Sequence, residues 1–206
     1  MTVLTLDAAL DGCAAGLVRD GITIAEQRAP GGRGSTAALP LLARTVLQVA
    51  DLSASALSGI AVTVGPGSFT GVRAALALAH GIALGSGVPV WGVTVGAALR
   101  AECVGSRPIW VGIDSKRGRI FLDRGGAIET VALDAIPSPD GPIAVAGDAA
   151  IALASRLAAR GFDIQLLGNR IPAAAGIAAA DRLPALPLYV DPPEARPGPP
   201  GRPAPV

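Results

Sequence analysis

Short apolar runs separated by glycine turns open the chain. The runs at residues 3–6, 14–18 and 22–26 are divided by the dipeptides Asp11-Gly12 and Asp20-Gly21. Asp-Gly dipeptides between apolar runs favour tight turns that join neighbouring strands. The pattern therefore predicts a three-stranded meander at the start of the chain.

The periodicity changes from that of a strand to that of a helix after the glycine-rich residues 31–34. Ser35 or Thr36 can cap a helix that runs to about residue 50. Its apolar positions recur at helical spacing: Leu39, Leu42, Val46 and Val49. Residues 60–64 are apolar throughout, as in a strand buried on both faces.

A second helix after this strand and a strand over residues 88–93 give the order βββαβαβ, with a further helix predicted at residues 94–102. The same order then recurs. Runs at 109–114, 119–123 and 127–130 form another meander, which is followed by strand, helix and strand at 143–148, 149–160 and 164–167.

Asp114 ends the first strand of the second meander, as Asp7 ends the first strand of the chain. The sequence therefore predicts an α/β fold of two lobes built from duplicated βββαβα units, with the second lobe truncated. We expect lobes at residues 1–98 and 99–190 and a Pro/Gly-rich tail at 191–206. The Pro/Gly bias begins at Pro187, and its composition is typical of disordered segments.

Charge and cysteine content narrow the class of protein. The 206 residues include 17 Lys and Arg against 16 Asp and Glu, so no strong field attracts nucleic acid or an anionic membrane. Cys13 and Cys103 lie far apart, which disfavours a disulfide scaffold or a zinc site. Neither a signal peptide nor a membrane span is recognisable, so we expect a cytoplasmic protein without membrane contact.

Residues 62–85, VTVGPGSFTGVRAALALAHGIALG, resemble a phosphate-binding glycine loop that opens a helix. A P-loop requires a lysine that this segment lacks, and the dinucleotide motif requires a third glycine where Thr70 stands. The stronger interpretation is a strand-to-helix turn with Ser68 or Thr70 as N-cap, and a phosphate cradle is the weaker alternative.

The helix within this segment carries an unusual set of small residues. Gly71 and Gly81 each cost roughly 1 kcal/mol of helix propensity relative to alanine. A stripe of small side chains recurs every three or four residues: Ala74, Ala77, Gly81 and Gly85. The stripe could pack against the protein's own sheet or against another protein. Arg73 opposes the helix dipole in the first turn, which predicts a nearby carboxylate in the same chain or in a partner.

The block GPGSFTGVR at residues 65–73, with its alanine- and glycine-rich helix, resembles the TsaB (YeaZ) family of bacteria. Weaker similarity extends to LTLDAALDGCAAGLV, LPLLARTVL, GIDSKRGRIF and LPLYVDPPEARP. The family often has a histidine just before its first helix, where this chain has Gly34.

The resemblance implies a two-lobe actin-like fold of the sugar-kinase and Hsp70 type. It also implies a non-catalytic subunit of the machinery that makes threonylcarbamoyladenosine next to the anticodon of tRNAs reading ANN codons. Its implied partners are a TsaD-type catalytic subunit, a TsaE-type ATPase and, through the complex, tRNA, with a homodimer in isolation. Helices 37–50 and 70–84 would dock the catalytic subunit, and the candidate contact residues are Leu41, Arg44, Phe69, Arg73, Ala74, Ala77, His80 and Gly81.

The reactive side chains agree with a non-catalytic role. His80 is the single histidine, so a metal-binding histidine pair or a catalytic triad is hard to assemble. Asp7 and Asp114 stand where actin-like ATPases place magnesium-associated aspartates, but neither begins an Asp-x-Gly motif. They remain weak candidates for nucleotide binding.

No metal and no intrinsic cofactor are expected, and ATP or ADP at the subunit interface stays open. The alternative is a small actin-like ATPase, a sugar-kinase relative or a peptidase that acts alone; a working homodimer is a third interpretation. A basic cluster could touch tRNA or form a solvated surface: Arg107, Lys116, Arg117 and Arg119.

Overall fold

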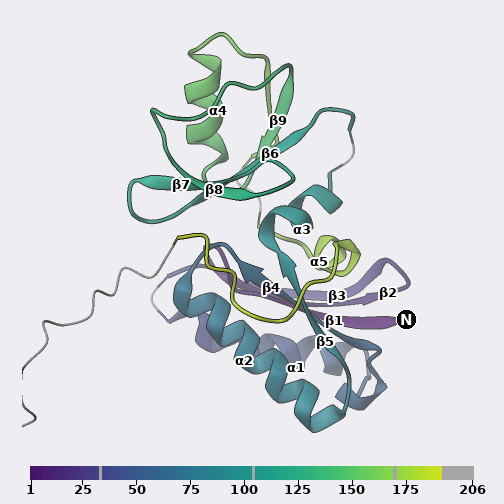
Figure 1. The fold of residues 1–206 in the computed structure, drawn as a ribbon. Helices are drawn as coiled ribbons and strands as arrows, with labels where there is room; N and C mark the ends of the chain where they lie inside the picture. Colours follow the sequence, from purple (N-terminus) through teal and green to yellow (C-terminus); the bar gives the residue numbers. More distant parts are fainter. Residues whose placement is uncertain (33, 104, 169–170, 192–206) are drawn as a thin grey trace, which may run out of the picture.

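The computed structural model describes residues 1–32, 34–103, 105–168 and 171–191 and contains two five-stranded sheets (Figure 1). The first sheet has the order β3-β2-β1-β4-β5 and comprises β1 (Thr2–Asp7), β2 (Cys13–Arg19), β3 (Ile22–Ala29), β4 (Gly59–Gly65) and β5 (Val90–Thr94). The second has the order β10-β9-β6-β7-β8 and comprises β6 (Ile109–Asp114), β7 (Arg119–Asp123), β8 (Ile128–Ala132), β9 (Ile143–Ala146) and β10 (Ile164–Leu166).

The two sheets share one topology. In each, a three-stranded antiparallel meander is extended by two parallel strands on the side of its first strand. The predicted meanders and the predicted duplication are therefore confirmed. The repeat is incomplete, because residues 133–142 form turns where the first half has a helix between its third and fourth strands. The second lobe is truncated, as expected.

Helices cover both faces of the first sheet. In Figure 1, α1 (Leu39–Val49) and α2 (Phe69–Ser86) lie on one face, whereas α3 (Val95–Ala101) and α5 (Ala174–Ala179) lie on the face toward the second sheet. The second sheet carries α4 (Ala150–Ala158). Two short 3₁₀ helices, η1 (Ser35–Ala38) and η2 (Ala54–Ala56), flank α1. Among the described helices, none combines the length and apolarity needed to cross a lipid bilayer.

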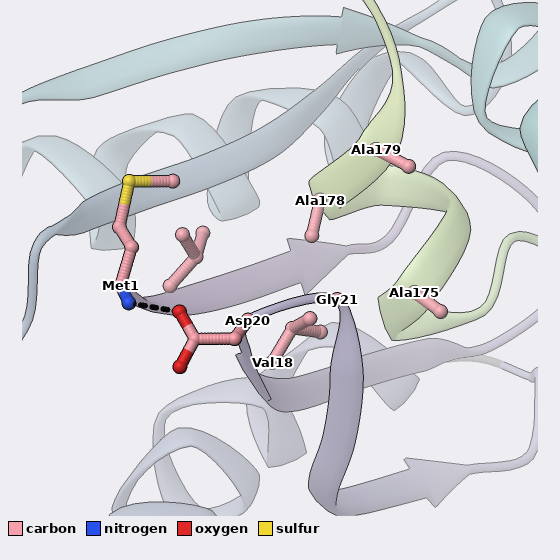
Figure 2. Close-up of a pocket in the computed structure, with 8 residues that line it drawn as sticks. Met1, Val18, Asp20, Gly21, Ala175, Ala178 and Ala179 are labelled. Carbon is pink, nitrogen blue, oxygen red and sulfur yellow. Dashed lines mark hydrogen bonds and ion pairs between the residues drawn. The ribbon is translucent and has the colours of Figure 1, made fainter.

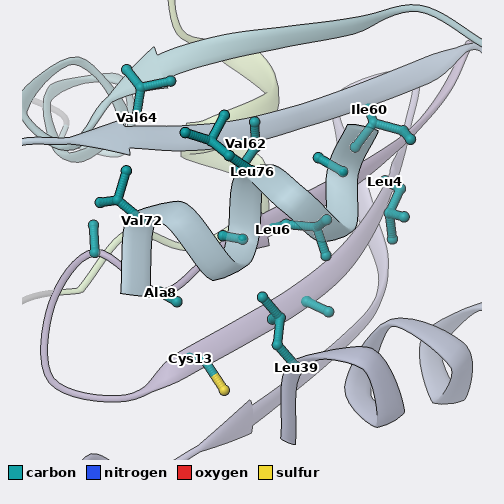
Figure 3. Close-up of a cluster of buried hydrophobic side chains, with 14 of the residues drawn as sticks. Leu4, Leu6, Ala8, Cys13, Leu39, Ile60, Val62, Val64, Val72 and Leu76 are labelled. Carbon is teal, nitrogen blue, oxygen red and sulfur yellow. The ribbon is translucent and has the colours of Figure 1, made fainter. Parts of the chain in front are cut away.

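Alternation along the central strands divides the core between the two faces. Leu4, Leu6, Ile60 and Val62 point toward α1 and α2, where Leu76 packs with them (Figure 3). The alternate positions of β1, β4 and β5 form a second cluster with α3 and α5: Val3, Ala61, Trp91, Val93, Ala98 and Ile177. Because both faces are covered, every residue of β4 is buried, as the uninterrupted apolar run predicted.

The start of the first helix differs from the prediction. Ser35 lies in η1, and α1 begins at Leu39 without a capping side chain. Pro40 lies in the first turn, where its fixed φ and missing N–H suit a helix start. Gly34 precedes η1 with φ 81°, a left-handed conformation that glycine adopts more readily than other residues.

The C-terminal part of the predicted second lobe lies elsewhere. α5, which the periodicity did not predict, contacts α3 and strands β1 to β4 of the first sheet. The segment after it continues along the first sheet, where Leu188 N donates to Val64 O at 2.9 Å. The extension of the second lobe to residue 190 is therefore wrong for residues 174–190. The division between residues 98 and 99 stays a prediction.

The proposed disordered tail is also wrong in its first residues. Residues 187–191 make hydrogen bonds to both sheets, and Asp191 itself accepts two. Composition alone did not reveal these specific contacts, which offset the entropy of ordering the segment. Residues 192–206 lie outside the described residues.

Candidate docking face and interlobe cleft

The glycine-rich turn before α2 packs closely against the loop that follows β1. Ser68 N donates to Ala9 O at 2.7 Å, and Ser68 Oγ accepts from Gly71 N at 3.1 Å. A Cβ added to Gly67 would lie 2.0 Å from Ala9 O, and one added to Gly71 would lie 1.9 Å from Ala8 O. These amides and this space are used by the chain itself. The turn with Ser68 as N-cap is confirmed, and the amides of Ser68 and Gly71 already have partners within the chain.

The small-residue stripe of α2 faces outward. The helix buries Val72, Ala75, Leu76 and Ala79 against the sheet, whereas Ala77, Gly81 and Gly85 are exposed and Ala74 is half-buried. A Cβ built on Gly81 or Gly85 meets no described atom within 4 Å. Packing against the protein's own sheet therefore does not explain the stripe.

The eight predicted contact residues lie on α1 and α2, which cover the same face of the first sheet (Figure 1). Large apolar side chains are exposed among them, with Leu41 54% and Phe69 66% accessible. Arg44 is also exposed. We call this set the docking face: Leu41, Arg44, Phe69, Arg73, Ala74, Ala77, His80 and Gly81.

Aromatic rings contact Arg73, and the predicted carboxylate does not appear among its described partners. The guanidinium lies 3.3 Å from the centroid of the Phe69 ring and donates to Tyr189 Oη at 2.6 Å. Both contacts stabilise a cation by its attraction to ring electrons or to an oxygen lone pair. His80 also meets the C-terminal segment, because its Nε2 lies 2.9 Å from Ala185 O.

The contribution of the C-terminal segment to this face was missed by sequence reasoning. Tyr189, the single tyrosine of the chain, was the available signal, but the prolines around it suggested a disordered tail.

A cleft of about 1060 Å³ lies between the two lobes. Its wall includes Asp114, Lys116 and Asp148 from the second lobe and Asp11 from the first. Lys116 Nζ lies 3.1 Å from Asp114 Oδ2 and 3.7 Å from Asp148 Oδ2, and Asp148 Oδ1 accepts from Asp114 N at 2.8 Å. Two of the carboxylates on this wall are therefore paired with one lysine of the same chain.

Lys116 also affects the pKa of the two aspartates beside it, Asp114 and Asp148. Partial burial alone would raise the pKa of Asp114, but the amide and ammonium of Lys116 outweigh it, so the pKa is lowered. Burial raises the pKa of Asp148 despite the hydrogen bond from Asp114 N and the charge of Lys116. Lys116 itself has a raised pKa, because hydrogen bonding to Asp114 and the nearby carboxylates outweigh its desolvation.

Asp7 lies inside the first lobe and is not among the residues that line the cleft. Only 2% of it is exposed, and its Oδ1 accepts from Thr63 Oγ1 at 2.5 Å and from Ala9 N at 3.1 Å. Burial raises its pKa. Of the two candidate aspartates, Asp114 alone is among the residues that line the cleft, and the described residues contain no cluster of three or more His, Cys, Asp or Glu able to hold a metal ion.

The predicted basic cluster is largely neutralised by acidic partners. Arg107 makes a bidentate pair with Asp163 at 2.8 and 3.0 Å, and Arg119 pairs with Asp191 at 3.3 Å. With Lys116 also paired, little unbalanced positive charge is left for a nucleic acid.

A smaller pocket of about 240 Å³ lies beside the N-terminus (Figure 2). The Met1 amino group pairs with Asp20 at its rim, and this bond lowers the pKa of the aspartate. The other lining atoms come from alanine, valine and glycine: Val3, Val18, Gly21, Ala175, Ala178 and Ala179. Apart from this paired amine and carboxylate, the lining residues supply no nucleophile or general base.

Comparison with known proteins identifies the family. The model of TsaD, tRNA N6-adenosine threonylcarbamoyltransferase, matches residues 24–159. An uncharacterized protein of Mycobacterium tuberculosis is 33% identical over 216 residues, which cover 95% of this chain and 94% of that protein. The tRNA threonylcarbamoyladenosine biosynthesis protein TsaB of Escherichia coli is 28% identical over 59% of this chain and 53% of its own length.

The solved structure of YeaZ from Pseudomonas aeruginosa has the same fold. It superposes with a TM-score of 0.77 and 22% identity, over 91% of this chain and 99% of its own. The two-lobe actin-like fold is therefore confirmed. With the sequence matches, this shows that the chain belongs to the family described by the TsaD model, as a member of its TsaB (YeaZ) group.

Proposed function

We propose that this protein is a non-catalytic subunit in the synthesis of threonylcarbamoyladenosine next to the anticodon of tRNAs that read ANN codons. It binds a TsaD-type catalytic subunit through the docking face and supports that subunit's activity. A TsaE-type ATPase completes the complex, and tRNA reaches the protein only through it. These partners belong to the cytoplasm, which is the proposed location.

One observation carries the proposal: Ala77, Gly81 and Gly85 on the outer side of α2 are small and exposed, and a Cβ built on either glycine meets no described atom within 4 Å. Glycine in a helix costs about 1 kcal/mol relative to alanine, so its use at Gly81 needs a compensating role. Small residues let a second helix approach closely, and the exposed Leu41 and Phe69 beside them supply apolar area for a protein contact.

The cleft supports a subunit that does no chemistry of its own. Lys116 pairs with Asp114 and Asp148, and Asp7 is buried against Thr63. A nucleotide-binding aspartate must be free to face magnesium or its water. The proposal therefore assigns ATP or ADP to the contact between the two subunits and not to the interlobe cleft.

Binding of the purified chain to a TsaD-type subunit of the same organism, measured by isothermal titration calorimetry, tests the docking face. Ala77→Trp and Gly81→Leu place bulk on the exposed stripe and should weaken the complex about tenfold or more, since overpacking typically costs 1–3 kcal/mol. Ala158→Trp, on the exposed side of α4, is the matched control and should bind normally. Normal binding by both stripe variants would refute the docking face.

The same preparation separates the alternatives. A scaffold subunit should hydrolyse neither ATP nor peptides, and turnover abolished by Asp7→Ala would favour an enzyme that acts alone. Mixing with the TsaD-type subunit should convert any homodimer into a heterodimer. A homodimer that persists in excess partner would favour self-association as the working state.

A further inference from the structure

Residues 183–191 form an extended segment, here called the strap, that is held along the first sheet. Leu183 and Gly92 exchange two backbone hydrogen bonds of 2.9 and 2.8 Å, and Leu188 N donates to Val64 O at 2.9 Å. Figure 1 shows the strap passing from α5 across the first lobe in front of α2 and ending below β8. The strap is thus fixed to β4 and β5 by main-chain bonds.

Side chains tie the middle of the strap to α2. His80 Nε2 lies 2.9 Å from Ala185 O, and Arg73 donates to Tyr189 Oη at 2.6 Å. Arg73 is held between this hydroxyl and the Phe69 ring. The strap therefore sets the orientation of a cation on the docking face.

The last described residue of the strap reaches the second sheet. Asp191 Oδ2 accepts from Arg119 on β7 at 3.3 Å, and its Oδ1 accepts from Thr130 Oγ1 on β8 at 2.5 Å. The carboxylate is partly buried and has donors on two adjacent strands, so it resists rotation better than an exposed ion pair. One nine-residue segment thus contacts both sheets and α2.

The chain itself crosses between the sheets twice, between α3 and β6 and between β10 and α5. Arg100 on α3 adds a contact with the buried Asp123 on β7 at 2.9 Å. These links lie near α3 and α5, whereas Asp191 contacts β7 and β8 at the far end of the strap. Contacts at two separated places restrict rotation of one lobe against the other more than contacts at one.

We propose that the strap is a conformational coupling device that fixes the second lobe relative to α2 and transmits lobe rotation to the docking face through Tyr189 and Arg73. The coupling between lobes is a property of the free chain. Its consequence for partner binding rests on the function proposed above.

The test measures the distance between the lobes in the free, full-length chain by pulsed electron paramagnetic resonance. Spin labels at Gln48→Cys on α1 and Ser155→Cys on α4 report on the first and second lobe, in a Cys103→Ser background that leaves the buried Cys13 in place. Asp191→Ala should broaden the distance distribution. Glu129→Ala is the matched control, because it removes an Arg124–Glu129 pair confined to the second lobe and should leave the distribution unchanged.

An unchanged distribution in Asp191→Ala would overturn the proposal. Should that variant fail to fold, Thr130→Val removes one of the two hydrogen bonds to Asp191 and should broaden the distribution to a smaller extent. Tyr189→Phe then tests whether the strap acts on the docking face through Arg73, because it keeps the ring and removes only the hydroxyl to which Arg73 donates. We expect a measurable loss of affinity for the TsaD-type subunit. If the unmodified chain does not bind that subunit, the proposed function fails, while the distance measurement still decides the coupling.

Discussion

Two glycines of α2 should respond to the same substitution in opposite directions. Gly81 is exposed, and an added Cβ meets nothing within 4 Å. Gly81→Ala therefore gains helix propensity at no steric cost, which should raise the free energy of unfolding by about 1 kcal/mol. At roughly 2–4 °C per kcal/mol for a chain of this size, the melting temperature should rise by about 2–4 °C.

Gly71 is buried, and a Cβ there would lie 1.9 Å from Ala8 O. A backbone oxygen cannot rotate away, so the helix and the loop that follows β1 must move apart. Forced overpacking costs 1–3 kcal/mol, and we expect the upper part of that range, reduced slightly by the propensity gain. Gly71→Ala should lose about 2 kcal/mol, which lowers the melting temperature by roughly 4–8 °C.

The assay is thermal and urea denaturation of both variants and the parent, followed by circular dichroism. The difference between the two variants should be about 3 kcal/mol, well above the usual error of such measurements. If both variants shift stability in the same direction, the assignment of one glycine to loop contact and the other to an open surface is wrong.

Three further predictions concern ionisable groups. Burial raises the pKa of Asp7 above its ordinary value of 3.8. The protonated carboxyl therefore contributes stability below that value, and this contribution is lost as pH rises through the pKa of the folded state. In urea denaturation, the wild type should lose stability relative to Asp7→Asn above about pH 4. Lys116→Met should raise the pKa of Asp114, because an amino group that stabilises the carboxylate is lost; a carboxyl titration by NMR measures this, and an unchanged pKa would contradict the contact. Burial and, to a smaller extent, the charge of Asp7 raise the pKa of the Cys13 thiol. Iodoacetamide should therefore modify Cys13 far more slowly in the native protein than in the denatured one, and mass spectrometry can follow this reaction.

The fold was accessible from the sequence where the local pattern had a single physical interpretation. The apolar run of β4 must be covered on both sides, and the Asp-Gly turns allow little besides a hairpin at Gly12 and Gly21. The repeat of the meander then predicted two lobes of the same kind. The start of α1 was misplaced because Ser35 was assumed to cap a helix that begins only at Leu39.

The candidate site was predicted only in part, because long-range contacts have no local signature. Helical spacing placed Ala77 and Gly81 on one stripe but left open whether it faces the sheet, and the structure shows both residues exposed. Arg73 was assigned a carboxylate because its first-turn position opposes the helix dipole, yet its partner Tyr189 lies 116 positions away in a proline-rich segment. Likewise, no pattern in the sequence reveals that Lys116 folds back onto Asp114 and Asp148.

Because residues 133–142 form no helix between β8 and β9, the two lobes present different surfaces. The first lobe presents a pair of long helices on one side of its sheet, whereas residues 133–142 leave the second lobe without the corresponding pair. Among the described residues, a pair of long helices on one side of a sheet occurs in the first lobe alone, so the two lobes offer unlike surfaces to a neighbouring chain.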